Sequence, residues 1–153
     1  MQKIGVFPGS FDPITKGHES IINKSLPLFE KVVIAIGVND TKNYLFSLKD
    51  RIKFIEDSFQ DEGKIEVVTY KGLTVDFCEK IGAKYLIRGI RNSNDFEFER
   101  GIAQVNRKLK GIDTVFFIAD GELSGLSSSI VRDVYKNGGV IDELVPKGVK
   151  PNK

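Results

Sequence analysis

Apolar and polar positions alternate along this chain in two recurring patterns. Short, nearly continuous apolar runs rich in β-branched residues are typical of strands that are covered on both faces. Between these runs, apolar residues recur every third or fourth position, as they do on one face of a helix. The apolar runs predict strands at 4–7, 32–38, 65–70, 85–87 and 114–118.

Five helices are expected between and after these strands. The first covers about 16–29, but Pro27 is expected to kink it or end it early, because proline lacks the amide hydrogen that a helix interior uses. The second begins at Ser47, which with Asp50 three residues later is typical of a capping box. The other three follow from apolar stripes: Leu73, Phe77 and Ile81 before Gly82; Phe98, Ile102, Val105 and Leu109 before Gly111; and Ile130, Val131, Val134 and Tyr135 after the serines at 127–129.

This alternation predicts an α/β fold: a Rossmann-like doubly wound, mostly parallel five-stranded sheet with helices on both faces. A chain of 153 residues without repeats or linkers suits a single domain, expected over 1–153 with a loose polar tail at 147–153. Ligands of such folds bind beyond the carboxyl ends of the strands, where the winding reverses. The loops after the strands are therefore the places to look for chemistry.

Composition excludes several classes of protein. The 23 basic and 21 acidic residues give a net charge of +2, without the basic excess of nucleic-acid binders, so no nucleic-acid partner is expected. The longest apolar run, 32–38, is too short to span a membrane, and no secretion signal is recognisable. We therefore expect a cytoplasmic protein without a membrane partner. The single cysteine, Cys78, excludes an intrachain disulfide and a cysteine-clustered metal site.

The loop after the first strand, GSFDPITKGH, contains the only histidine, His18. Gly9 and Gly17 leave room for a ligand beside the backbone. The helix that follows directs free amides and the positive end of its dipole toward this loop. A lone histidine is ordinarily structural, but this setting favours a function, in which Ser10 and His18 contact one phosphoryl group.

Three cationic side chains follow other strands. Lys42 lies after the second strand, where a phosphate contact and a merely solvated side chain are both reasonable interpretations. Arg88 and Arg91 occur in RGIRN after the fourth strand. Their guanidinium groups suit a bidentate grip on phosphate oxygens. The alternative is a surface pair of arginines with acidic partners such as Asp95 or Glu97.

The loop after the fifth strand, SGLSSS at 124–129, is rich in hydroxyl groups at the start of a helix. Capping that helix requires one serine, so the additional serines predict a phosphate cradle. Asp95 and Glu97 in the first turn of the preceding helix are explained by the helix dipole, whereas Glu99 is deeper and can face the cleft. Motifs for a Walker loop, a dinucleotide fingerprint, a catalytic triad or a zinc helix are not found.

These motifs, GSFDPITKGH, Lys42, RGIRN, DFEFER and SGLSSS, resemble in their order and spacing the bacterial phosphopantetheine adenylyltransferase family. That family belongs to the nucleotidyltransferase superfamily with the (H/T)xGH motif. The resemblance covers nearly the whole chain, and RGIRN and DFEFER make it specific. It implies transfer of AMP from ATP to 4′-phosphopantetheine, which gives dephospho-coenzyme A and pyrophosphate in the penultimate step of coenzyme A synthesis. It also implies Mg²⁺ as cofactor, a cytoplasmic homohexamer and feedback inhibition by coenzyme A.

The resemblance also implies the roles of individual residues. Those with a catalytic role are His18, Ser10, Lys42 and Arg91. Those that bind phosphopantetheine are Ser10, Lys42, Thr74 and Arg88. Those that bind ATP are Ser10, Phe11, His18, Gly89, Ile90, Arg91, Glu99, Leu123, Ser124, Gly125, Leu126, Ser127, Ser128 and Ser129. No Mg²⁺ ligand is implied.

The chain departs from the family pattern at a few positions. Phe98 stands where tyrosine is common, and Thr74 is more polar than the usual apolar residue. The ELSG stretch before the serines lacks the bulky aromatic residue of some members. The alternatives are a cytidylyltransferase, a nicotinamide mononucleotide adenylyltransferase, or a nucleotide-binding module without catalysis. RGIRN with DFEFER argues against the first two, and a second anion site argues against the third.

Overall fold

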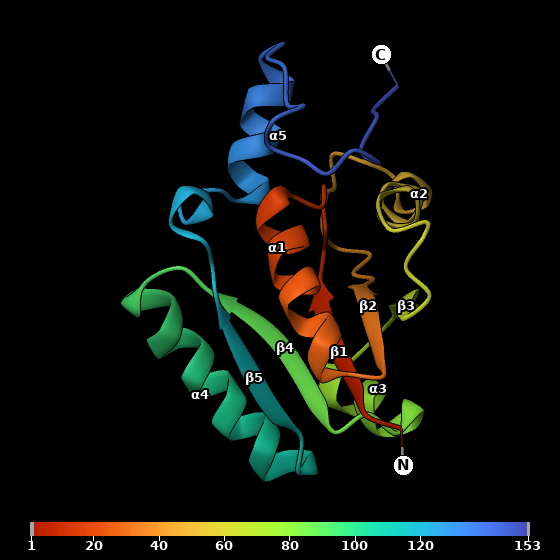
Figure 1. The fold of residues 1–153 in the computed structure, drawn as a ribbon, viewed down its shortest axis with the longest axis vertical. Helices are drawn as coiled ribbons and strands as arrows, with labels where there is room; N and C mark the ends of the chain where they lie inside the picture. Colours follow the sequence, from red (N-terminus) through yellow and green to blue (C-terminus); the bar gives the residue numbers. More distant parts are fainter. Residues whose placement is uncertain (1, 153) are drawn as a thin grey trace.

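A computed structural model describes residues 2–152 of the protein. Within this part, five strands form one parallel sheet in the order β3-β2-β1-β4-β5 (Figure 1). The predicted α/β fold with a parallel five-stranded sheet is thereby confirmed. The strands are β1 Ile4–Gly9, β2 Lys31–Gly37, β3 Ile65–Tyr70, β4 Tyr85–Ile90 and β5 Asp113–Ile118.

The helices follow the predicted stripes. Pro27 lies in a short 3₁₀ turn, Leu26–Leu28, and the first helix ends before it, as a proline requires. Gly82 and Gly111 end two others in the left-handed conformation, at φ of 76° and 68°. The α-helices are α1 Lys16–Ser25, α2 Leu48–Ser58, α3 Thr74–Ile81, α4 Ser93–Lys110 and α5 Ser128–Lys136, and a second 3₁₀ turn covers Gly121–Leu123.

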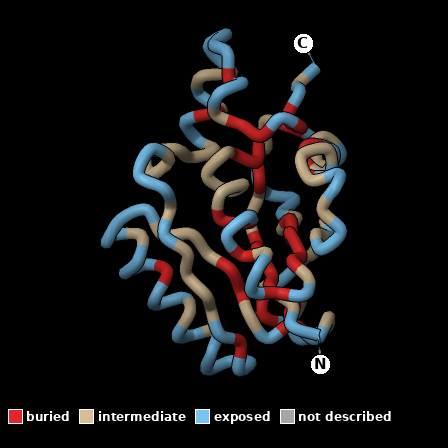
Figure 2. Tube along the Cα trace, in the orientation of Figure 1, coloured by how far each residue is buried: buried red, intermediate tan, exposed pale blue. Residues whose placement is uncertain are grey.

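Two apolar clusters form on the two faces of the sheet. On one face, strand residues such as Phe7 and Ile34 pack with residues of α1, α2 and α5. On the other, their neighbours Val6 and Val33 pack with residues of α3. Successive strand residues therefore alternate between two buried faces, and Figure 2 shows the buried residues concentrated in the central strands.

The central strands separate at the end where a ligand is expected. β1 pairs with β2 over six residues, but its pairing with β4 is limited to Gly5 with Tyr85 and Val6 with Leu86. Because β2 and β4 flank β1 and the chain reaches them in opposite directions across the sheet, the winding reverses between β1 and β4. This is the point at which α/β sheets open a crevice for ligands.

The tail differs from the expectation of a loose segment over 147–153. Within the described residues, Val149 is buried and packs into the larger cluster, and its amide donates to the carbonyl of Pro146. Gly148 lies so close to the backbone of Ser58 that a side chain would not fit there. Residue 153 lies outside the described part. Between residues 2 and 152, none of the helices is both long enough and apolar enough to cross a membrane.

Candidate active site

A cleft opens at the carboxyl ends of β1 and β4, where these strands separate. It is bordered by the loop after β1, by the end of β4, by the start of α4 and by the loop before α5. The cleft therefore brings together three of the four loops that the sequence singled out. The expected site residues that line it are His18, Arg88, Gly89, Arg91, Glu99, Leu123, Leu126, Ser127 and Ser128.

His18 is the third residue of α1, and its ring completes a capping box with Thr15. The Thr15 side chain accepts a hydrogen bond from the His18 amide, and His18 Nδ1 accepts one from the Thr15 amide at 2.9 Å. Burial, together with the positive charges of Arg88 and Arg91, lowers the pKa of His18 to about 4. At neutral pH the imidazole is uncharged and offers a hydrogen-bond donor instead of a positive charge.

The ring of Phe11 packs against the imidazole of His18. Its ring is buried and makes an edge contact with His18, with 5.0 Å between ring centroids, and with Phe7 at 5.5 Å. Its backbone takes a positive φ of 49°, which is uncommon for a residue other than glycine. Because the ring is covered, the side chain of Phe11 does not line the cleft, although the sequence placed Phe11 among the site residues.

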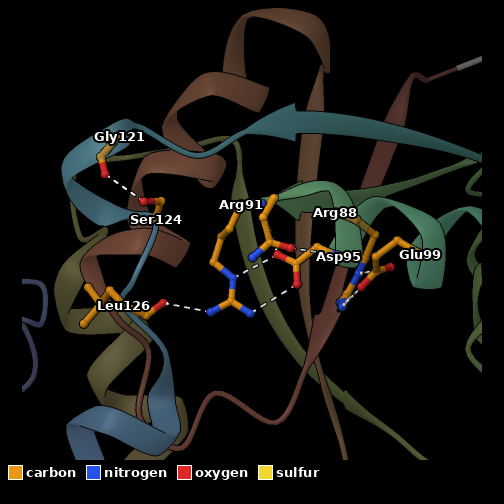
Figure 3. Close-up of polar contacts among 8 residues, drawn as sticks. Arg88, Arg91, Asp95, Glu99, Gly121, Ser124 and Leu126 are labelled. Atoms are coloured by element: carbon orange, nitrogen blue, oxygen red, sulfur yellow. Dashed lines mark hydrogen bonds and ion pairs between the residues drawn. The ribbon is translucent and has the colours of Figure 1, made fainter.

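Arg88 and Glu99 form a bidentate ion pair (Figure 3), with Nε and Nη2 of the arginine 3.0 and 2.7 Å from the carboxylate oxygens. Arg88 Nη1 also donates to the Pro8 carbonyl of β1 at 2.9 Å, across the gap between the separating strands. β4 runs to Ile90, beyond the predicted end at 87, so Arg88 is a strand residue and not a loop residue. Its hydrogen bonds explain how a strand accommodates it.

Arg91 is held by Asp95, as the alternative interpretation of RGIRN proposed. Its Nε lies 3.0 Å from the Asp95 carboxylate, and Nη1 donates to the Leu126 carbonyl at 3.4 Å (Figure 3). The hydrogen bond from Arg91 is the main cause that lowers the pKa of Asp95. The pair links α4 to the loop before α5, and Arg91 still faces the cleft.

The serines around the start of α5 have structural partners as well as a place near the cleft. Ser127 caps the helix by accepting from the Ile130 amide, and Ser128 Oγ donates to the Pro13 carbonyl at 2.9 Å. Ser124 Oγ donates to the Gly121 carbonyl (Figure 3), and Ser129 Oγ accepts from Arg132. These contacts explain part of the surplus of serines that the sequence assigned to a phosphate cradle.

A second pocket adjoins the cleft on the other side of the Arg88–Glu99 pair. Both residues border both pockets. The second pocket is lined by the apolar Phe98 and Ile102 of α4 and by Thr74, whose hydroxyl lies 2.8 Å from that of Tyr70. A ligand with an apolar arm and a few polar groups suits this lining.

Seven expected residues lie outside the linings of these two pockets: Phe11, Ser124 and Ser129, described above, and Ser10, Lys42, Ile90 and Gly125. Ser10 lies in the loop after β1, next to Gly9, which borders both pockets. Lys42 is exposed in the loop after β2, where its amide donates to the Asn39 carbonyl at 3.1 Å. Ile90 ends β4, and Gly125 lies between the lining residues Leu123 and Leu126.

The sequence interpretation missed the residues that support these loops. Arg51 of α2 is buried and donates to the Ser10 and Phe46 carbonyls. It lies on the same stripe as Leu48 and Ile55, and a charged residue on an apolar stripe is the signal that would have revealed it. The capping role of Thr15 was also recognisable, because it stands three residues before His18, whose ring nitrogen can accept a hydrogen bond from the Thr15 amide.

Comparison with known proteins agrees with this geometry. The cytidylyltransferase-like family model matches residues 6–134. A Flavobacterium johnsoniae protein described as phosphopantetheine adenylyltransferase is 55% identical over 97% of this chain and 97% of the relative. A Flavobacterium psychrophilum protein with the same description is 53% identical over 95% of this chain and 96% of the relative.

Solved structures show the same fold. A bifunctional NMN adenylyltransferase/ADP ribose pyrophosphatase from Francisella tularensis aligns with a TM-score of 0.70. The alignment covers 95% of this chain and 45% of that one at 20% identity, so it supports the fold alone. The sequence matches are far closer and extend over nearly the full length. The chain therefore belongs to the phosphopantetheine adenylyltransferase family, within the cytidylyltransferase-like nucleotidyltransferases.

Proposed function

We propose that this chain transfers AMP from ATP to 4′-phosphopantetheine and forms dephospho-coenzyme A and pyrophosphate. The observation that carries the proposal is the pair of adjoining pockets that share the Arg88–Glu99 ion pair as a common wall. An enzyme that joins two ligands needs two pockets that meet where the bond forms. A module that only binds a nucleotide needs one.

The lining of each pocket suits one substrate. The cleft with His18, Arg91 and the start of α5 suits ATP, because it combines hydrogen-bond donors, positive charge and a helix N-terminus. The pocket with Thr74 and Phe98 suits the pantetheine arm. Arg88 lies between them and holds the phosphate of phosphopantetheine, and Lys42 assists from the loop after β2.

The reaction is an in-line displacement at the α-phosphorus of ATP. The attacking phosphate is already an anion at neutral pH, so no strong base is required. Arg88 and Lys42 hold the attacking group, while Arg91 and the Nε2–H of His18 stabilise the charge that develops on the phosphoryl group and on pyrophosphate. Catalysis thus consists of positioning and charge stabilisation, without a covalent intermediate on the protein.

The expected Mg²⁺ fits this site as a companion of the ATP phosphates. Over residues 2–152, no three His, Cys, Asp or Glu side chains gather as a metal site, and both carboxylates of the cleft are paired with arginines. Such a site favours a cation that keeps water and phosphate oxygens as ligands. When bound there, Mg²⁺ supplies positive charge to the polyphosphate.

The further expectations are a cytoplasmic homohexamer and inhibition by coenzyme A. An apolar stripe on α4 supports self-association, since Phe98, Val105 and Leu109 are each more than half exposed, at 71, 55 and 56%. Inhibition by coenzyme A is consistent with two adjoining pockets, because that molecule carries both an adenylate and a pantetheine arm.

One assay tests the proposal against its alternatives. The protein is mixed with Mg²⁺, with ATP or CTP, and with each candidate acceptor in turn, and pyrophosphate release is measured. We expect release with ATP and 4′-phosphopantetheine. Release only with CTP, or only with nicotinamide mononucleotide, would point to the corresponding alternative enzyme, and no release with any pair would favour a binding module.

A further inference from the structure

Arg51, a buried residue of α2, connects the loop after β1 to the loop after β2. Only 3% of it is exposed. Its Nη1 donates to the Ser10 carbonyl at 2.9 Å, and its Nε donates to the Phe46 carbonyl at 3.1 Å. The guanidinium carbon lies 4.0 Å from the centre of the Tyr44 ring. One side chain therefore contacts both loops at once.

Asp12 makes the reciprocal connection from the loop after β1. Its carboxylate oxygens accept hydrogen bonds from the amides of Leu45 and Phe46, at 2.8 and 2.9 Å. Asp12 is also buried, and its own carbonyl accepts from Arg132 of α5 at 3.0 Å. The two loops are thus tied by contacts that run in both directions, and these contacts lie next to Ser10 on one loop and just after Lys42 on the other.

Stability alone does not explain a buried arginine at this place. Burial of a charge is costly, and an apolar side chain of similar size is often as stabilising as a buried charged one. Burial disfavours the charged form of Arg51 and lowers its pKa, and the nearby negative charge of Asp12 partly opposes this shift. What arginine offers and an apolar residue lacks is a planar, rigid group of donors that spans two carbonyls while it stacks on an aromatic ring.

We infer that Arg51 is a positioning residue that sets the location of Ser10 relative to Lys42 without contacting a substrate. This inference rests on the proposed function and on the residue roles that the family resemblance implies, in which Ser10 and Lys42 both contact 4′-phosphopantetheine. The loop of Lys42 is exposed, so its position depends on the few contacts that fix its end. ATP shares Ser10, but its other expected contacts, such as His18 and the start of α5, are held by the Thr15 capping box and by Ser128.

The test is the Arg51→Lys variant, which keeps the charge and most of the aliphatic stem but loses the planar group. We expect kcat/KM for 4′-phosphopantetheine to fall about 10-fold or more, because small displacements of a substrate-positioning group have large effects on rate. KM for ATP is expected to rise less than KM for 4′-phosphopantetheine, because ATP shares only Ser10 with the acceptor side and not Lys42. Ile55→Val, a core change on the same helix, serves as the matched control and should leave both KM values unchanged.

The outcomes separate the inference from the proposed function. If the unmodified protein forms no pyrophosphate from ATP and 4′-phosphopantetheine, the proposed function fails, and the inference fails with it. If that protein is active and Arg51→Lys matches it, or loses equally for both substrates, only the positioning inference is overturned. Should Arg51→Lys fail to fold, the test passes to Tyr44→Leu, which removes the stacking ring. A KM that rises more for 4′-phosphopantetheine than for ATP supports the inference. An unchanged KM for 4′-phosphopantetheine, or an equal rise of both KM values, overturns it.

Discussion

The Nδ1 atom of His18 accepts a hydrogen bond from the backbone amide of Thr15 at 2.9 Å. A ring nitrogen that accepts a hydrogen bond carries no proton, so the neutral imidazole holds its proton on Nε2. The capping box that begins α1 therefore also selects the tautomer of the only histidine in the chain. It leaves a single N–H donor for a ligand in the cleft.

The titration of His18 is the first testable consequence. Burial and the two neighbouring arginines lower its pKa to about 4, so we expect the imidazole to stay neutral, as the Nε2–H tautomer, from pH 8 down to roughly pH 5. Long-range ¹H–¹⁵N NMR can follow this one histidine without an assignment problem. In the unfolded chain the histidine binds a proton near pH 6.5, whereas in the folded protein it does so near pH 4. The contribution of His18 to the free energy of unfolding is therefore at its full value above pH 6.5 and is lost as the pH falls toward 4. A midpoint at 6.5 or above contradicts the assignment.

Replacement of His18 separates its two roles. Glutamine at position 18 can still accept a hydrogen bond from the Thr15 amide, as glutamine does in ordinary capping boxes. It has no N–H where the imidazole Nε2–H stands. We expect His18→Gln to fold normally and to lose about 10²-fold in kcat, a typical cost for one preorganised stabilising contact. His18→Ala should lose at least as much turnover and also some helix stability. Steady-state kinetics with circular dichroism distinguishes these effects, and near-normal turnover in a folded variant would remove His18 from the mechanism.

The Arg88–Glu99 pair predicts a difference between stability and binding. Arg88→Ala leaves the buried Glu99 carboxylate without its cation, so we expect it to cost about 1–3 kcal/mol in free energy of unfolding and also to weaken 4′-phosphopantetheine binding. Adding Glu99→Gln to Arg88→Ala removes the unpaired charge. The double variant should regain stability in urea unfolding but not affinity in calorimetry. Recovery of both would mean that Arg88 acts only as a structural partner of Glu99.

The fold was predictable because its signal is local, whereas much of the site was not. Continuous apolar runs and helical stripes identified every strand and every α-helix of the described residues, and Pro27 marked the end of α1, but the 3₁₀ turn at Gly121–Leu123 left no such signal. The end of β4 was missed because Arg88 interrupts the apolar run. Its partner is eleven residues away on α4, and nothing in the local pattern shows that Glu99, and not Asp95 or Glu97, meets it.

The same limit applies to the tail and to the support of the loops. Val149 stands between glycine and lysine, so its burial against the core leaves no periodic signal in the sequence. The bridge from Arg51 to Ser10 spans 41 positions and depends on how α2 packs on the sheet. Sequence patterns therefore identified three loops that border the cleft, while the contacts that hold these loops emerge only from tertiary structure.

Lys42 provides a test of the acceptor site that is independent of the cleft arginines. It is exposed in the loop after β2, so its removal should leave stability nearly unchanged. We expect Lys42→Ala to weaken 4′-phosphopantetheine binding about 10-fold or more, the scale of one hydrogen bond to a charged group. ATP affinity should be unaffected. Calorimetry of both ligands measures this, with the exposed Lys49→Ala as control; equal affinities for the acceptor in all three proteins would exclude Lys42 from the site.

The apolar stripe of α4 predicts how self-association can be disrupted. Val105 is 55% exposed and lies between Phe98 and Leu109 on this stripe, so a carboxylate there would be buried unpaired in any interface that covers the stripe. We expect Val105→Glu to fold but to sediment as a smaller species than the unmodified protein. The control is Arg100→Glu, which also places a carboxylate at an exposed position of the same helix. If the stripe is the interface, this variant should leave the assembly intact. Analytical ultracentrifugation decides between them. A monomeric unmodified protein would refute the homohexamer, and an unchanged assembly in Val105→Glu would place the interface elsewhere.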